Sequence, residues 1–213
     1  MTSRWSENAV FFREYVRHFR TTGAILPSGR RLAGALTRFV REPSAEPRRI
    51  LEVGPGTGAV TRHIIHGMGE RDHLDLVELN HTFVNQLERR FQSEPTFQAV
   101  AGRARVLHCP VEELPGEDRY DLIVSGLPLN NFSVAEVERL LAVLCGRLTP
   151  EGQLSFFEYI AVRPARALVS GPSDRVRLRG IGQAMKALLD RQEVRRDAVW
   201  LNVPPAWVHH VRA

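Results

Sequence analysis

The sequence has a single lysine, only two cysteines and no long run of uncharged residues. Cys109 and Cys145 form no metal-ligand spacing, and their small number argues against a disulfide framework. The longest stretches without Asp, Glu, Lys or Arg cover 122–135 and 198–211, and both are too short to span a bilayer. Charged residues stand near the N-terminus where a signal peptide needs an apolar core, so we expect an intracellular chain.

The composition is that of a globular protein, with 43% hydrophobic and 25% charged residues in a chain of 213. A disordered or collagen-like chain is therefore excluded. The net charge of +5 is unevenly distributed, because residues 1–41 hold eight arginines against two glutamates and the remainder is nearly neutral. Since the guanidinium fork matches phosphate geometry, this basic segment predicts contact with an anionic surface.

Residues 1–41 are predicted to form two helices. Apolar residues recur three or four apart over 5–19, with arginines beside them, which is typical of an amphipathic helix. Ser28 is the expected N-cap of a second helix that runs to about Val40. Two prolines within 42–47 then indicate a linker.

From residue 48 onward, apolar runs alternate with amphipathic stretches. Strands are predicted over 49–53, 74–79, 105–108, 120–125 and 153–160, and a terminal hairpin over 194–203 and 207–211. Helices are predicted over 59–67, 81–91, 134–148 and 181–190, with a turn at 149–152 and a loop over 163–180. The order predicts an α/β, Rossmann-like fold with a mostly parallel seven-stranded sheet, an antiparallel C-terminal hairpin and N-terminal helices.

The most informative motif lies where the first predicted strand meets a glycine-rich turn. Glu52 precedes the turn, which contains Gly54, Pro55, Gly56 and Gly58. The glycines permit a tight turn and let a ligand approach the backbone, and a helix N-terminus follows. No Gly-Lys-Ser/Thr follows, which excludes a Walker loop, and the spacing differs from the dinucleotide fingerprint.

An acid, Glu78, ends the second predicted strand twenty residues after the turn, where it can accept hydrogen bonds from both hydroxyls of a ribose. The turn and this acid together resemble the class I S-adenosylmethionine (SAM) methyltransferases. That resemblance implies SAM as the cofactor, with the turn at its methionine end and Glu78 at its ribose. Because Pro110 replaces the usual acid after the third strand, Val111 and the backbone are expected to contact the adenine. The cofactor residues implied are Glu52, Gly54, Pro55, Gly56, Gly58, Glu78, Leu79, Val111 and Ser125.

The sequence of the loop after the fourth predicted strand narrows the range of possible methyl acceptors. Its sequence resembles the Asn-Leu-Pro-Tyr loop of ribosomal RNA adenine dimethylases, whose Asn and Tyr hold the base. Here Gly126 and Leu129 occupy those two positions, so the groups that hold a base are missing.

A resemblance over nearly the whole chain is to the bacterial soluble phospholipid N-methyltransferases. They share Ser-Gly-Leu-Pro, an N-terminal Phe-Phe-Arg, a Thr-Gly-Ala-x-x-Pro-Ser segment and the terminal hairpin, which are found here at 125–128, 11–13, 22–28 and 199–206. Asn130 departs from their usual apolar residue. The resemblance implies methylation of phosphatidylethanolamine toward phosphatidylcholine, with Ser125, Gly126, Leu127 and Pro128 as the catalytic loop that positions the amine.

The substrate contacts follow from this resemblance and from charge. Tyr15 is a candidate for contacting the headgroup, and Arg175, Arg177 and Arg179 for meeting a lipid phosphate. We expect 1–41 to bind an anionic membrane surface and close as a lid over a SAM-binding catalytic domain at 48–213. The chain would then work in the cytoplasm at the inner face of the membrane.

Three other functions remain open. They are methylation of a phosphate-free ornithine lipid, ribosomal RNA adenine dimethylation, and a protein that binds SAM or a membrane without turnover. The histidines show no metal spacing, so no metal is expected, and the missing base-holding residues argue against a nucleic-acid partner. The oligomeric state stays open.

Overall fold

The structure, a computed structural model, describes residues 29–116, 118–160 and 172–212. The helix expected over 5–19, with Tyr15, and the predicted N-cap Ser28 lie outside these residues. Within the described ranges, no helix has both the length and the apolar character needed to cross a membrane.

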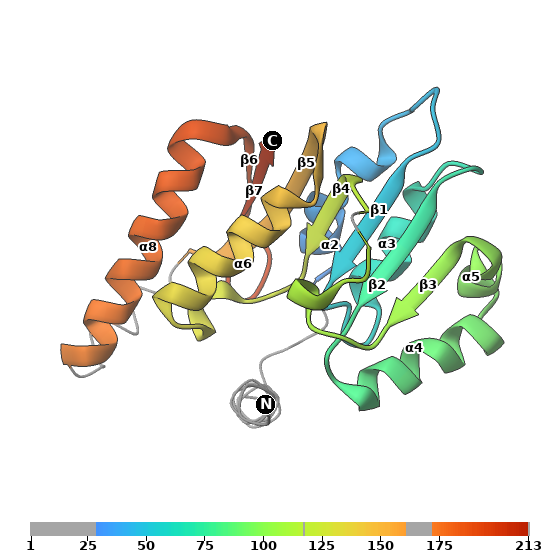
Figure 1. Cartoon of the computed structure of the whole chain (residues 1–213), viewed down its shortest axis with the longest axis horizontal. Helices are drawn as coiled ribbons and strands as arrows, with labels where there is room; N and C mark the ends of the chain where they lie inside the picture. Colours follow the sequence, from blue (N-terminus) through green and yellow to red (C-terminus); the bar gives the residue numbers. More distant parts are fainter. Residues whose placement is uncertain (1–28, 117, 161–171, 213) are drawn as a thin grey trace.

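Seven strands form one mixed sheet in the order β3-β2-β1-β4-β5-β7-β6. The first five in that order are parallel, and β7 pairs antiparallel with both β5 and β6, as the sequence predicts (Figure 1). The strands are β1 (Arg49–Val53), β2 (His73–Val77), β3 (Ala104–Leu107), β4 (Tyr120–Ser125), β5 (Leu148–Tyr159), β6 (Glu193–Val199) and β7 (Ala206–Arg212).

Helices cover both faces of the sheet (Figure 1). One face carries α2, α3 and α5, and the other carries α6 and α8. The helices are α2 (Arg30–Leu36), α3 (Ala59–Gly67), α4 (His81–Ser93), α5 (Pro95–Gln98), α6 (Val134–Gly146) and α8 (Pro172–Gln192), with short 3₁₀ turns η1 (Phe39–Arg41), η2 (Ala101–Arg103), η3 (Val111–Glu113) and η4 (Leu129–Asn131).

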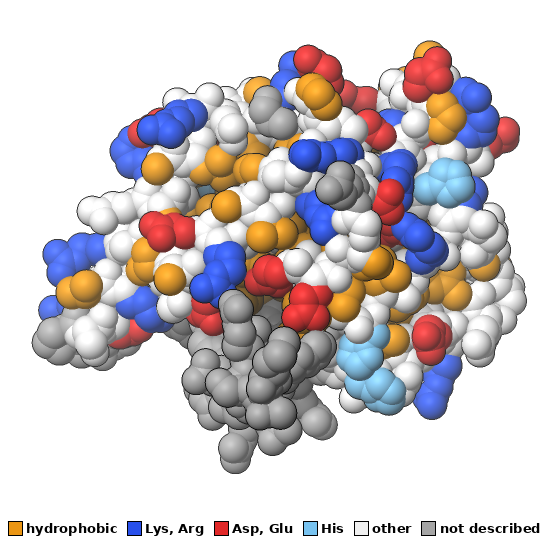
Figure 2. Space-filling view, viewed as in Figure 1, with side chains coloured by type: hydrophobic (Ala, Val, Ile, Leu, Met, Phe, Trp, Pro, Cys, Tyr) orange, Lys and Arg blue, Asp and Glu red, His pale blue; other side chains and the backbone are white. Residues whose placement is uncertain are grey.

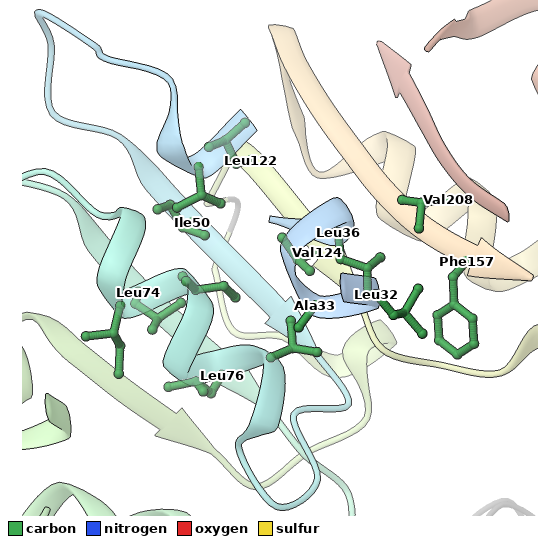
Figure 3. Packing of buried hydrophobic residues seen from close by; sticks show 14 of the residues in the cluster. Leu32, Ala33, Leu36, Ile50, Leu74, Leu76, Leu122, Val124, Phe157 and Val208 are labelled. Atoms are coloured by element: carbon green, nitrogen blue, oxygen red, sulfur yellow. The ribbon is translucent and has the colours of Figure 1, made fainter. Parts of the chain in front are cut away.

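The helix α2 packs into the same core as the strands. Figure 3 shows Leu32, Ala33 and Leu36 pointing toward the sheet residues Val124 and Phe157. All three α2 side chains are buried, and a fully buried leucine contributes about 1.5–3 kcal/mol of transfer free energy. Helix α2, which belongs to the basic segment 1–41, is therefore part of the globular fold.

Two sequence predictions about the second half of the chain are wrong. The loop predicted over 163–180 gives way to helix at Pro172, so Arg175, Arg177 and Arg179 lie on α8. The turn predicted at 149–152 lies within β5, because Leu148 already pairs with Tyr120 and the register then shifts. The extra residues bulge out of the ladder.

Candidate active site

The candidate site lies where β1, β2 and β4 end, at the carboxyl edge of the sheet. The turn after β1 has positive φ angles at Gly54 (+70°), Gly56 (+55°) and Gly58 (+81°). L-residues adopt this region only with strain, so the turn requires glycine at all three positions. Gly58 is also the N-cap of α3, which directs the helix N-terminus toward the turn.

Glu78 ties this turn to the end of β2. Its Oε2 accepts a hydrogen bond from the Gly56 N–H at 3.0 Å, and its Oε1 accepts one from the Asn80 N–H at 2.8 Å. Burial raises the pKa of Glu78, and these backbone donors counteract that rise. Each carboxylate oxygen has a further lone pair, so Glu78 can still accept from ribose hydroxyls.

Glu52, at the end of β1, is buried with only 1% of its surface exposed. Neither of its carboxylate oxygens has a hydrogen-bond partner among the described residues. Burial raises the pKa of Glu52 to about 8, and the nearby Glu78 charge adds to the rise. Thr61 lies next to Glu52, and its hydroxyl and backbone N–H lower the pKa of Glu52, which offsets only part of the rise. Neither contact has the geometry of a hydrogen bond within the described residues.

A buried carboxyl without a partner is costly, and a cationic ligand group removes that cost. The ammonium at the methionine end of SAM is such a group. The unpartnered Glu52, the hydrogen-bonded Glu78 and the turn between them therefore fit the polar parts of SAM.

A cleft opens beside these residues. Leu79 and Val111, which the sequence assigns to the cofactor, line it together with Gly54 and Glu78. The full lining is Val53, Gly54, Val77, Glu78, Leu79, Cys109, Pro110, Val111, Glu112, Leu127, Phe132, Glu136, Arg139 and Leu140. Of the other predicted residues, Glu52, Pro55, Gly56, Gly58, Ser125, Gly126 and Pro128 are not part of this lining.

The loop after β4 packs directly against the glycine turn. The Gly126 N–H donates to the Val53 carbonyl at 2.8 Å, and a Cβ at Gly126 would lie 2.8 Å from the Gly54 carbonyl oxygen. A Cβ at Gly54 would in turn lie 2.7 Å from Leu127 Cδ2. Ser125 is fully buried, and its hydroxyl accepts from the Leu127 N–H at 3.4 Å. Glycines at both positions thus let the predicted catalytic loop and cofactor turn touch.

The three arginines predicted to meet a phosphate all lie on α8. Arg177 donates to the carbonyls of Asn130 and Phe132 at 3.0 and 2.8 Å and pairs with Asp174 at 2.6 Å. Arg179 lies on another side of α8, and its Nε donates to a carbonyl of its own helix. Arg177 therefore anchors the end of the loop after β4.

Helix α6 contributes part of the cleft that the sequence did not indicate. Phe132, Glu136, Arg139 and Leu140 line the cleft from the start of this helix. The one available signal is the capping box, in which Ser133 and Glu136 exchange hydrogen bonds with each other's backbone N–H. That motif predicts a helix start and gives no information about a cleft.

A Ser–His–Asp line, not foreseen from the sequence, joins β5, β7 and β6. The Ser155 hydroxyl lies 2.8 Å from His210 Nδ1, and His210 Nε2 lies 3.4 Å from Asp197. His210 is fully buried, and burial lowers its pKa to about 4, so the ring is neutral near pH 7. Asp197 pairs with Arg38 at 2.6 Å. The line binds strands together within the core, away from the cleft.

The chain is similar in sequence to proteins of known function. The chain matches a family described as "Methyltransferase domain" over residues 50–152. It is 27% identical to an ornithine lipid N-methyltransferase of Singulisphaera acidiphila over 67% of this chain and 73% of that protein. It is 34% identical to ribosomal RNA small subunit methyltransferase A of Pseudomonas syringae pv. tomato, over 46% of this chain and only 35% of that protein.

A solved structure shows the same fold at low sequence identity. It is the Burkholderia thailandensis 1,6-didemethyltoxoflavin-N1-methyltransferase with bound 1,6-didemethyltoxoflavin and S-adenosylhomocysteine. The TM-score is 0.66 at 17% identity, over 100% of this chain and 91% of that one. The expected Rossmann-like fold is confirmed.

Proposed function

We propose that this chain is a SAM-dependent methyltransferase whose acceptor is an amine nitrogen in the headgroup of a membrane lipid. The composition of the cleft beside the loop after β4 carries the proposal. Leu127, Phe132 and Leu140 are an apolar part of its lining, which also includes the carboxylates of Glu112 and Glu136 and the guanidinium of Arg139. An apolar wall suits an acyl chain, and carboxylates favour a cationic amine over a polyphosphate backbone.

The strands β1–β3 and the glycine turn after β1 would hold the cofactor. SAM supplies a methyl group activated by its sulfonium. Glu52 would pair with the ammonium of the methionine end, and Glu78 would accept from the ribose hydroxyls. Leu79 and Val111 would cover the adenine from the cleft wall.

The loop after β4 would place the acceptor. Methyl transfer is an in-line displacement, so most of the rate enhancement comes from positioning and from excluding water. The backbone of Ser125–Pro128, held against the turn, would fix the nitrogen in line with the methyl group. The amine must shed a proton before attack, and Glu112 and Glu136 stand at the cleft where they can accept it.

Between the two lipid headgroups, ornithine lipid is the first choice and phosphatidylethanolamine the second. The relative from Singulisphaera acidiphila, matched over 67% of this chain, is an ornithine lipid N-methyltransferase. Arg177 is occupied by intramolecular bonds, so one of the three arginines proposed for a phosphate is already engaged. A phosphate-free headgroup needs no such cluster. The resemblance of 125–128 to phospholipid N-methyltransferases keeps phosphatidylethanolamine as the second choice.

A ribosomal RNA substrate is less well supported. Figure 2 shows Lys and Arg side chains scattered over one face of the molecule and mixed with acidic ones. Nucleic-acid binding instead calls for a basic stripe that follows the phosphates. Gly126 and Leu129 also replace the residues expected to hold an adenine.

A methyl-transfer assay with labelled SAM tests the proposal. The purified chain would be offered ornithine lipid, phosphatidylethanolamine and ribosomal RNA in separate reactions. Label in either lipid supports the proposal and identifies the headgroup. Label in RNA alone, or no label in any lipid while SAM binds, rejects it.

A further inference from the structure

The turn between β6 and β7 exposes an unusual group of apolar side chains. Trp200, Leu201 and Val203 are 62%, 71% and 76% exposed. We call residues 200–205 the hairpin tip. Exposed apolar residues are normal when scattered singly, but three within four residues mark an interaction surface.

The hairpin tip has the reverse polarity of an ordinary surface turn. Its polar residue, Asn202, is only 8% exposed, and its side chain donates to the Pro204 carbonyl at 2.7 Å. The Asn202 side-chain oxygen accepts from the Gly29 N–H at 3.3 Å. The Ile160 N–H donates to the Pro205 carbonyl at 2.9 Å. These bonds hold the tip against the fold with its apolar side chains outward.

The hairpin tip lies at the same edge of the sheet as the candidate active site. Tyr159, at the end of β5, pairs with Ala206, which also pairs with Val199. Because β5 runs parallel to β4 and β1, its end lies at the carboxyl edge with the glycine turn (Figure 1). A flat surface that meets the tip therefore also faces this edge.

Positively charged side chains lie next to the hairpin tip. The Arg196 guanidinium stacks 4.8 Å from the ring of Trp207, which itself contacts Trp200 at 5.7 Å. No carboxylate pairs with Arg196 within the described residues. Gly29 lies beside Asn202, so α2 begins next to the tip with the exposed side chains of Arg30 and Arg31. Exposed Trp and aliphatic side chains flanked by arginine suit the interface of an anionic bilayer.

We propose that the hairpin tip docks on anionic lipid bilayers, with Trp200, Leu201 and Val203 entering the interface so that the active-site edge faces the headgroups. This inference rests on the proposed lipid acceptor, since it explains how an amine in a membrane reaches the cleft. Its test uses vesicles that contain no amine acceptor, so docking is measured independently of methyl transfer.

The experiment measures sedimentation of the full chain with phosphatidylcholine vesicles, with and without phosphatidylglycerol. Leu201→Ser is compared with Val194→Ser, which removes an apolar side chain, 49% exposed, from the opposite end of the same hairpin. We expect Leu201→Ser to weaken binding several-fold and Trp200→Ser/Leu201→Ser/Val203→Ser to weaken it at least about tenfold. Val194→Ser should bind anionic vesicles as the parent chain does.

Thermal unfolding checks that the variants fold, and the single Leu201→Ser replacement serves if the triple variant does not. Equal vesicle binding by the parent chain and the folded tip variants overturns the proposal. So does a parent chain that ignores anionic vesicles and forms a dimer that Leu201→Ser dissociates, because a second copy then covers the tip. Tip-dependent vesicle binding without lipid methylation retains docking and rejects the proposed acceptor.

Discussion

The two halves of the sheet differ in the sequence distance over which their functional groups are held. In the cofactor half, β1–β3 with the glycine turn, Glu78 bonds to Gly56 and Asn80, 22 and 2 residues away. In the acceptor half, β4–β7 with α6 and α8, the loop after β4 is anchored by Arg177, whose partner Asn130 lies 47 residues away. Groups that bond over a short sequence distance form a motif that can be recognised in the sequence, whereas groups that bond over a long distance do not.

One charged side chain in each half shows a further difference. Arg177 is bonded to two carbonyls and a carboxylate, whereas the Glu52 carboxylate is buried with no partner within the described residues. The bonds of Arg177 tie the end of the loop after β4 to α8. The cofactor half instead keeps an unmet interaction that its ligand completes.

The largest effect is expected from Glu78→Ala. It removes the acceptor for ribose hydroxyls and leaves the Gly56 and Asn80 N–H groups without their bonds, so SAM affinity should fall by about 1–3 kcal/mol. The thermal unfolding temperature should fall as well. Titration calorimetry and thermal unfolding measure the two effects, with Glu88→Ala on the exposed side of α4 as the control. Unchanged affinity would remove Glu78 from the ribose site.

Glu52→Gln should lower SAM affinity about tenfold near neutral pH, because Gln cannot become the carboxylate that pairs with the ligand's ammonium. Stability should not fall, because Glu52 is already protonated in the apoprotein near neutral pH. The raised pKa, about 8 against an ordinary 4.5, means that the native apoprotein holds a proton that the unfolded chain has released. The free energy of unfolding of the apoprotein should therefore fall as the pH rises from about 4.5 to 8, and the substitution should flatten this slope.

SAM binding by the parent chain should strengthen as pH rises from about 5.5 to 7.5, because the ligand's ammonium favours the ionised carboxylate. Calorimetry at several pH values, in buffers of different ionisation enthalpy, reports the proton released. If the affinity of the parent chain and Glu52→Gln shows the same pH dependence, Glu52 does not meet the ammonium.

The smallest effect is expected from Arg177→Leu. Loss of its bonds to two loop carbonyls should lower the free energy of unfolding by about 1 kcal/mol and reduce kcat for every acceptor. Arg179→Leu, on the same helix, is the matched control. If only a phosphate-bearing lipid loses turnover, Arg177 binds phosphate and the contrast between the halves fails.

The cofactor half could be predicted almost fully from the sequence. The strand at 49–53 and the helix at 59–67 have the predicted bounds, because an apolar run, a glycine turn and an amphipathic stretch follow each other without interruption. Placing the glycine turn and Glu78 at one edge of the sheet needed only the order of the strands. What the sequence could not show is that Glu52 is left without a partner, since that depends on packing around it.

In the acceptor half, the start of α8 could not be predicted from the sequence, and the reason is local. Arginine alternates with Val176 and Leu178 before Gly180, a pattern of period two that hides a helix. The helical signal is the buried series Leu178, Ile181 and Met185, at spacings of three and four. Gly180 is tolerated because α8 approaches α6 there, where a Cβ would lie 2.6 Å from a Val134 methyl group.

The contact between Gly126 and the turn after β1 links the two sites thermodynamically. The Gly126 N–H bonds to the Val53 carbonyl, and Leu127 occupies the space that a side chain at Gly54 would need. A shift of the loop on acceptor binding is therefore transmitted to the turn that holds the methyl donor. By reciprocity, each ligand changes the affinity of the other by the same factor. Any such coupling between donor and acceptor affinity would act through this backbone contact.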